Sequence, residues 1–201
     1  MTSRLEAVRQ IIHSLKIEQI VEMGTFRGTT AEWFAQFGLP FETVEISERY
    51  YSFSKRRLKP YVNAEIYRDT SISFLKKRIA QKKTDRNTRQ LFYLDSHWEK
   101  HLPLREEMEL ILNNYANVVI LIDDFQVDGD PGYCFDAYSE TDRLTMSYLS
   151  QAKLPDHIQY FYPATRSGDE TGMRRGWVVA TDNSVMANSL DAIPLLRRAE
   201  N

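Results

Sequence analysis

The sequence has little of several features that define large classes of protein. It contains one cysteine, Cys134, so an internal disulfide is impossible and a reducing compartment is the simplest expectation. No apolar run approaches the roughly 20 residues needed to cross a bilayer, and the first residues lack the apolar core of a secretory signal. No sign of charge dominates, because 26 lysines and arginines oppose 28 aspartates and glutamates. We therefore expect a cytoplasmic protein that binds neither membranes nor nucleic acid by general charge attraction.

The remaining composition is that of an ordinary globular protein. The chain has 201 residues, of which 42% are hydrophobic and 27% charged, and this suits one domain with a sizeable core. We expect a single domain over 1–201, with an N-terminal helix in 1–18, a core in 19–182 and a C-terminal tail in 183–201. The tail is expected to be a short helix or partly ordered.

Apolar runs alternate with helical patterns along most of the chain. Short β-rich runs predict strands, and residues at helical spacing predict helices between them. The expected strands are 19–23, 43–46, 65–67, 91–94, 118–122, 158–162 and 177–180, and the expected helices are near 3–15, 29–37, 48–58, 70–81 and 101–113. This alternation is typical of βαβ units and a parallel sheet. The polar stretch 166–176 indicates a hairpin connection, and the aperiodic stretch 126–140 suggests a lid over a site.

The most informative motif is Val-Glu-Met-Gly-Thr-Phe-Arg-Gly-Thr-Thr at 21–30, which predicts a strand, a glycine turn and the start of a helix. Gly24 and Gly28 are too far apart for the G-x-G-x-x-G pattern that a pyrophosphate demands. Glu22 precedes them, and an acid beside a glycine turn suits a ligand that carries an ammonium group. Glu45 ends the second strand about 20 residues on, where a carboxylate can accept both hydroxyls of a ribose. The alternatives are a turn without a ligand and a solvated carboxylate at the strand end.

Three acidic residues follow the fourth and fifth strands. Asp95 follows the fourth, and Asp123 and Asp124 end the fifth. Because parallel strands end at the same edge of a sheet, these carboxylates should converge, and a divalent cation would relieve their repulsion. Oxygen ligands favour Mg²⁺ over Mn²⁺ or Ca²⁺. The alternative is that Asp95 contacts only a bound ligand while the other two cap a loop.

Other polar and aromatic residues near these strand ends have more than one interpretation. His97 could accept a proton, pack as a structural residue or bind a metal, and His101 is expected on a helix face. Trp98 could stack on a ligand or lie in the core. Arg174 and Arg175 could hold an anionic group, although a solvated hairpin tip is the simpler interpretation.

The string Glu-Met-Gly-Thr-Phe-Arg-Gly-Thr-Thr at 22–30 resembles motif I of the class I S-adenosylmethionine-dependent methyltransferases. It is most similar to the metal-dependent O-methyltransferases of the catechol, caffeoyl-CoA and macrolide-sugar types, in which E-x-G-T-x-x-G-x-[ST] recurs. The resemblance covers about 20–182, and Asp95, Asp123 and Asp124 match the metal-binding positions. The chain departs from the pattern at 113–117, where Asn-Asn-Tyr-Ala-Asn replaces a Gly-Gly turn, and in its shorter N-terminal region.

The resemblance implies a Rossmann-like α/β fold, with a doubly wound, mostly parallel seven-stranded sheet in the order 3-2-1-4-5-7-6 and helices on both faces. It implies transfer of a methyl group from S-adenosylmethionine to a hydroxyl of a sugar, a glycoside or a phenol, assisted by Mg²⁺ or another divalent cation. An N-methyltransferase and a non-catalytic S-adenosylmethionine-binding protein are the alternatives. With little chain outside the core fold, the acceptor pocket is expected from 126–150, the N-terminal helix or the second subunit of a homodimer.

The same resemblance assigns roles to individual residues. His97 and Asp95 are the expected catalytic residues, with Lys100 as an alternative base, and the expected metal ligands are Asp95, Asp123 and Asp124. Asp69 is expected at the adenine pocket, unless it caps the following helix. The expected cofactor contacts are Glu22, Gly24, Thr25, Phe26, Gly28, Thr29, Glu45, Ile46, Asp69, Thr70, Ser71, Asp95 and Trp98.

Overall fold

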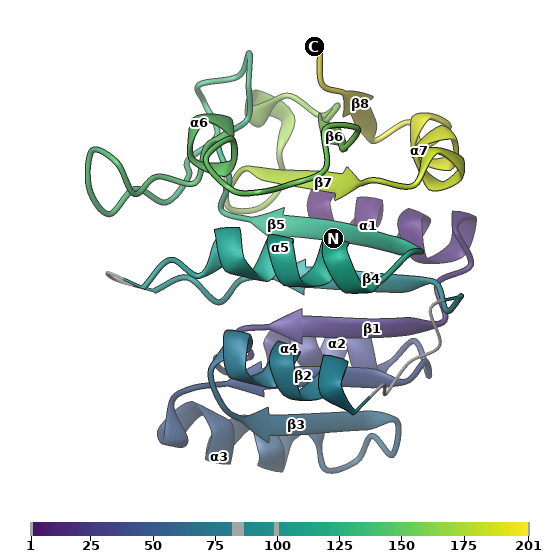
Figure 1. Ribbon diagram of the computed structural model, residues 1–201, viewed down its shortest axis with the longest axis vertical. Helices are drawn as coiled ribbons and strands as arrows, with labels where there is room; N and C mark the ends of the chain where they lie inside the picture. The colour runs from purple at the N-terminus through teal and green to yellow at the C-terminus, as the bar shows by residue number, and fades with distance from the viewer. Residues whose placement is uncertain (1, 82–86, 99–100, 201) are drawn as a thin grey trace.

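The computed structural model describes residues 2–81, 87–98 and 101–200, and its strands form one eight-stranded sheet (Figure 1). The strands are β1 (Gln19–Met23), β2 (Phe41–Glu45), β3 (Ala64–Arg68), β4 (Gln90–Leu94), β5 (Val118–Asp123), β6 (Gln159–Pro163), β7 (Trp177–Thr181) and β8 (Leu196–Arg198). The helices are α1 (Ser3–Ser14), α2 (Thr29–Ala35), α3 (Glu48–Leu58), α4 (Ser71–Ala80), α5 (Leu104–Asn114), α6 (Met146–Leu149) and α7 (Ser184–Asp191), with a short 3₁₀ helix, η1 (Ser167–Asp169).

The strand order is β3-β2-β1-β4-β5-β7-β6-β8, which confirms the predicted order of the first seven strands. Strands β1 to β5 are parallel to one another, and antiparallel pairs join β5 to β7, β7 to β6 and β6 to β8. The predicted count of seven was wrong, because the tail contains both helix α7 and strand β8. Strand β8 has only three residues, two of them arginines, so its sequence lacks the apolar alternation that predicts a strand.

The sheet buries both of its faces under helices, as a parallel sheet must. Side chains of α1, α2, α3 and α7 pack on one face, and side chains of α4, α5 and α6 pack on the other. Figure 1 shows α4 and α5 in front of the sheet and α1 and α2 behind it. Within the described stretches, no helix combines the length and the apolar composition needed to cross a membrane.

Helix α5 begins three residues later than predicted. Pro103 occupies its N-cap, and His101 lies before the helix, in a backbone bridge with Trp98. The expectation that His101 lies on a helix face was therefore wrong. Proline fits the start of a helix because it has no backbone N–H to donate.

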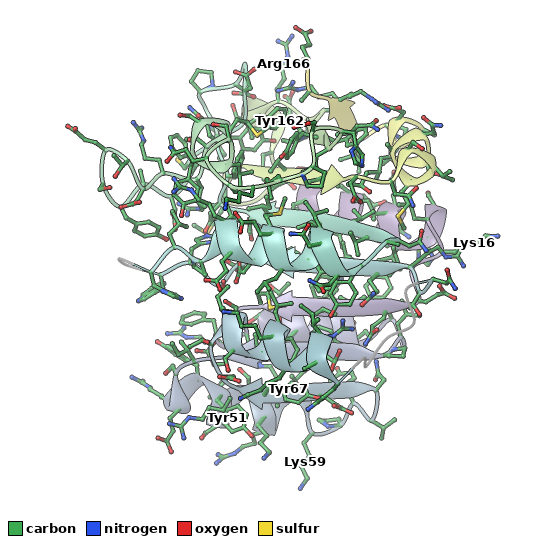
Figure 2. The ribbon with its side chains drawn as sticks, in the orientation of Figure 1. Lys16, Tyr51, Lys59, Tyr67, Tyr162 and Arg166 are labelled. Carbon is green, nitrogen blue, oxygen red and sulfur yellow. The ribbon has the colours of Figure 1, made fainter. Side chains whose placement is uncertain are left out.

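The register of the central strands brings their carboxyl ends to one edge of the sheet. Met23 of β1 lies between Val44 of β2 and Leu94 of β4, and Leu94 in turn pairs with Ile122 of β5. The residues that follow these four reach the same edge and are Gly24, Glu45, Asp95 and Asp123. Figure 2 labels Tyr51, Lys59 and Tyr67 near the β3 end of the sheet and Tyr162 and Arg166 near the opposite end; the edge described here runs between these ends.

Candidate functional site

The turn after β1 requires glycine at Gly24. Its φ of 95° lies in the left-handed region, and a Cβ there would lie 2.0 Å from the backbone oxygen of Asp95. The backbone N–H of Asp95 also donates to the Met23 carbonyl at 2.8 Å. Gly28, with φ of 70°, precedes α2 as its N-cap. The first glycine therefore lets the ends of β1 and β4 meet closely, which no other residue would allow.

Glu22 lies in a buried polar chain beneath this turn. Its Oε2 accepts a hydrogen bond from the Thr43 hydroxyl at 2.6 Å, and that hydroxyl also lies 2.6 Å from the Thr25 hydroxyl. Burial raises the pKa of Glu22 to about 8, although the Thr43 hydrogen bond works the other way. Glu22 is therefore mostly protonated at neutral pH, and a cationic partner would favour its ionised form.

Glu45, the last residue of β2, holds the loop that follows β1. Its two carboxylate oxygens accept from the backbone N–H groups of Phe26 and Ser47, each at 2.7 Å. The Ser54 hydroxyl donates to the Phe26 carbonyl at 2.6 Å, so the loop is held from both sides. Each oxygen of Glu45 has a further lone pair, which leaves it able to accept from ligand hydroxyls.

Exposed aromatic side chains lie beside Glu45. The Phe26 ring centroid is 4.4 Å from that of Tyr50 and 6.3 Å from that of Trp98. Trp98 is 70% exposed and Phe26 is 44% exposed, so Trp98 is not a core residue. Ile46 is also exposed, at 62%. Apolar side chains exposed together near a strand edge are typical of a surface that a ligand covers.

The residues after β3 form a helix cap. The Thr70 hydroxyl accepts from the Ser73 N–H at 3.1 Å, so Thr70 rather than Asp69 caps α4. Asp69 accepts from the Thr70 N–H at 2.9 Å and from Lys77 at 2.7 Å. Ser71, the first residue of α4, is buried, and Thr29, the first residue of α2, is exposed. The cap hypothesis for Asp69 was therefore wrong.

Asp95, His97 and Asp124 come together at the edge of the sheet. One potential ligand atom from each lies within 4.8 Å of the others. His97 is buried, and its Nε2 lies 3.8 Å from Asp95 Oδ1 and 3.7 Å from Asp124 Oδ2. Nε2 has no hydrogen-bond partner among the described residues. Burial, followed by the charges of Asp123 and Asp124, raises the pKa of Asp95 well above its ordinary value.

Asp123 makes a separate set of contacts. Its oxygens accept from the guanidinium of Arg4 and, at 2.6 Å, from the hydroxyl of Tyr93, while Oδ1 also accepts from the backbone N–H of Asp124 at 2.8 Å. Asp123 is 3% exposed. Among the described residues, the group with metal-ligand spacing includes Asp124 and not Asp123.

Asp136, in the stretch 126–140, and Arg175, just before β7, both contact Asp124. The backbone N–H of Asp136 donates to the Asp124 carbonyl at 2.9 Å, and Asp136 Oδ2 lies 3.9 Å from Nε2 of His97. Arg175 donates to both Asp124 and Asp136. Although burial opposes it, hydrogen bonding by Arg175 lowers the pKa of Asp124. The interpretation of Arg175 as part of a solvated tip was therefore wrong, whereas Arg174 is exposed.

The stretch 126–140, which was expected to form a lid, contacts the site through residues of its second half. Besides the contact of Asp136, Cys134 exchanges backbone hydrogen bonds with the hairpin, accepting from Gly176 at 2.8 Å and donating to Arg174 at 2.7 Å. Gly176 also lies close to the start of this stretch, since a Cβ there would be 2.2 Å from the Phe125 carbonyl oxygen. These contacts fix Asp136 in place.

Sequence reasoning missed Arg4, Tyr93 and Asp136. The sequence did contain a sign that Arg4 faces the sheet, because it lies at helical spacing from Val8 and Ile11 on the apolar side of α1. Tyr93 also had one, since a tyrosine within a buried strand needs a partner for its hydroxyl. No local pattern identifies Asp136. The alternative base, Lys100, lies outside the described residues.

The sequence matches no protein-family model and no curated protein, but the structure is similar to solved methyltransferases. An O-methyltransferase from Bacillus cereus in complex with SAH superposes with a TM-score of 0.62 and 15% identity, over 88% of this chain and 80% of that one. A putative O-methyltransferase from Klebsiella pneumoniae gives 0.61 and 14%, over 90% and 80%. The methyltransferase domain of bacterial CtHen1 gives 0.62 and 12%, over 90% and 98%. At these identities the likeness establishes the fold alone, which this chain shares with these methyltransferases.

Proposed function

We propose that this protein transfers a methyl group from S-adenosylmethionine to a hydroxyl of a small molecule, with the assistance of a divalent cation. One observation carries the proposal: the strand register places the glycine turn and Glu45 on the same sheet edge as the acidic group around His97. A cofactor bound over the turn would therefore present its methyl group toward that group. The structures of O-methyltransferases with this fold, one of them in complex with SAH, support the choice.

On the cofactor side, the roles follow from charge and position. Glu22 pairs with the methionine ammonium and becomes ionised when it does so, because the cation offsets the cost of burying its charge. Glu45 accepts the ribose hydroxyls with the lone pairs that Phe26 and Ser47 leave free. Trp98 and Ile46 cover the adenine with exposed apolar surface. Of the remaining expected contacts, Thr25, Asp69 and Thr70 lie on the turns after β1 and β3, and Thr29 and Ser71 are the first residues of the helices that follow.

On the acceptor side, the group around His97 fits a cation. A buried ring nitrogen without a hydrogen-bond partner among the described residues faces carboxylates that repel one another. Asp95 and Asp124 would hold the cation, with His97 next to both. A bound divalent cation would supply Lewis acidity, which lowers the pKa of an acceptor hydroxyl.

The chemistry is an in-line displacement. The acceptor oxygen attacks the methyl carbon, the carbon–sulfur bond breaks, and S-adenosylhomocysteine leaves with the electron pair on sulfur. The hydroxyl proton goes to the His97 imidazole if that ring is free, or to water if the ring binds the cation. Because the sulfonium is already reactive, most of the rate enhancement comes from positioning and electrostatics.

Calorimetric titration of S-adenosylmethionine into wild type and Glu45→Gln tests the cofactor half of the proposal. We expect micromolar binding to wild type and at least tenfold weaker binding to the variant. Glu18→Gln is the matched control, since Glu18 is an exposed glutamate just before β1, at the opposite end of that strand. Equal affinity of Glu45→Gln and wild type would remove the ribose role, and the absence of binding to wild type would refute the proposal.

Transfer of a radiolabelled methyl group to a panel of sugars, glycosides and phenols tests the catalytic half. We expect label in at least one hydroxyl acceptor, and a loss of that label in Asp95→Asn. Cofactor binding combined with no transfer to any hydroxyl, but with transfer to an amine, would identify an N-methyltransferase instead.

A further inference from the structure

The residues around His97 form a set of donors that differs from the three carboxylates expected from the sequence. Three carboxylate oxygens surround its Nε2, at 3.8 Å from Asp95, 3.7 Å from Asp124 and 3.9 Å from Asp136. These separations are too long for hydrogen bonds. In a tetrahedral metal site with bonds of about 2.1 Å, the donor atoms lie about 3.4 Å apart. The ligand atoms of Asp95, His97 and Asp124 already lie within 4.8 Å of one another, so an inward movement would bring these three to bonding distance of one ion. Asp136 lies outside that group but has Oδ2 3.9 Å from Nε2, so it would join the same ion by a further movement of its side chain.

Two partly buried arginines, Arg4 and Arg175, divide the acids of this edge into two groups. Arg4 neutralises Asp123, whose oxygens are also engaged by Tyr93 and by a backbone N–H. Arg175 contributes one positive charge to the second group, through Asp124 and Asp136. The three acids of the second group are Asp95, Asp124 and Asp136. When all of them are ionised, the group retains two negative charges, which one divalent cation would balance.

We propose that the cation site consists of Asp95, His97, Asp124 and Asp136, that Asp123 is not a ligand, and that the site prefers a first-row transition metal such as Mn²⁺, Fe²⁺ or Zn²⁺ to Mg²⁺. The inference concerns the same edge as the proposed function and rests on it for its role in catalysis. The preference follows from the imidazole, because neutral nitrogen ligands suit Zn²⁺ and Fe²⁺, whereas Mg²⁺ is bound mainly through oxygen.

Asp136 is held in position for this task by the backbone. Its N–H donates to the Asp124 carbonyl, and its own carbonyl accepts from the Leu144 N–H at 2.9 Å. Tyr138 donates to Asp136 Oδ2 at 2.7 Å and orients that oxygen. A ligand whose orientation is fixed by neighbouring hydrogen bonds binds a metal more tightly than a free one. The stretch 126–140 thus supplies a donor to the site in addition to covering it.

Cation binding by the full chain, without cofactor or acceptor, tests the inference directly. Titrations of Mn²⁺, Zn²⁺, Co²⁺ and Mg²⁺ are followed by calorimetry in wild type and in the single variants His97→Gln, Asp136→Asn and Asp123→Asn. We expect Co²⁺ and Zn²⁺ to bind at least a hundredfold more tightly than Mg²⁺. His97→Gln and Asp136→Asn should each weaken Co²⁺ binding at least tenfold, and Asp123→Asn should change it less than threefold. His157→Gln is the matched histidine control and should leave binding unchanged.

A second measurement uses only the wild type, in case a variant fails to fold. Proton NMR of the Co²⁺-loaded protein should show contact-shifted histidine ring resonances, which require a metal–nitrogen bond. The inference is overturned if these resonances are absent, if none of the cations binds at millimolar concentration, or if Asp123→Asn abolishes binding while Asp136→Asn does not. Titration of S-adenosylmethionine into the same metal-free protein separates the two proposals. Cation binding without cofactor binding would refute only the proposed function.

Discussion

Replacing Glu22 by glutamine should change the pH dependence of folding stability in a direction that the structure fixes. Burial raises the pKa of this carboxyl from the ordinary 4.5 to about 8 in the folded protein. Between these two values the folded chain holds a proton that the unfolded chain has lost. The free energy of unfolding therefore falls as pH rises, by up to about 1.4 kcal/mol per pH unit. From pH 5 to pH 8 the wild type should lose about 3 kcal/mol more than Glu22→Gln, which has no proton to lose.

Urea denaturation of both proteins at intervals between pH 5 and pH 8 measures this difference. The other titrating groups are common to both proteins and cancel in the comparison. Parallel stability profiles would refute the reasoning, because they would mean that Glu22 is ionised in the folded state. The same protonation predicts that S-adenosylmethionine binding at pH 7 releases close to one proton. Calorimetry in two buffers of different ionisation enthalpy detects that proton, and Glu22→Gln should lose both the proton release and most of the affinity.

Three further predictions concern the turn, the buried ion pair and the exposed ring. Gly24→Ala should destabilise the fold by more than about 2 kcal/mol and abolish cofactor binding, because a Cβ there meets backbone. Gly38→Ala, with a similar φ and open space, should lose only about 1 kcal/mol in the same denaturation assay. Arg4→Met should lower the free energy of unfolding by about 3 kcal/mol because it leaves the buried Asp123 unpaired, and Asp123→Asn in the same chain should restore part of that loss; no restoration would contradict the pairing. Trp98→Ala should leave the thermal midpoint nearly unchanged but weaken S-adenosylmethionine binding severalfold, whereas equal affinity would place the ring outside the cofactor site.

The fold was largely predictable because its local signals agree with one another. Strand β5, for example, is a continuous apolar run that ends in two acids, as expected of a strand buried on both faces. Helix ends were less predictable where proline intervened, as at Pro103. Strand β8 escaped notice because it is held by its pairing with β6 and not by an apolar pattern of its own.

At the candidate site, the sequence located the edge but not the orientation of each acid. Successive side chains of a strand point to opposite faces, so Asp123 faces α1 together with Val119 and Leu121 of the same strand. Asp124 has a φ of 53° and has left the strand geometry, which turns it toward His97. No local sequence pattern predicts the left-handed backbone of Asp124 or its contact with Asp136, because both depend on tertiary contacts.

Strand β8 also determines which parts of the sheet remain open to other chains. By pairing with β6, it covers an edge whose backbone groups would otherwise be available to an added strand. The new edge is three residues long and carries Arg197 and Arg198, and short, positively charged edges resist strand addition. Among the described strands, β3 then provides the other edge of the sheet. Self-association by strand pairing is therefore disfavoured at the β8 end, and we propose that any pairing of two copies uses the helices or β3 instead.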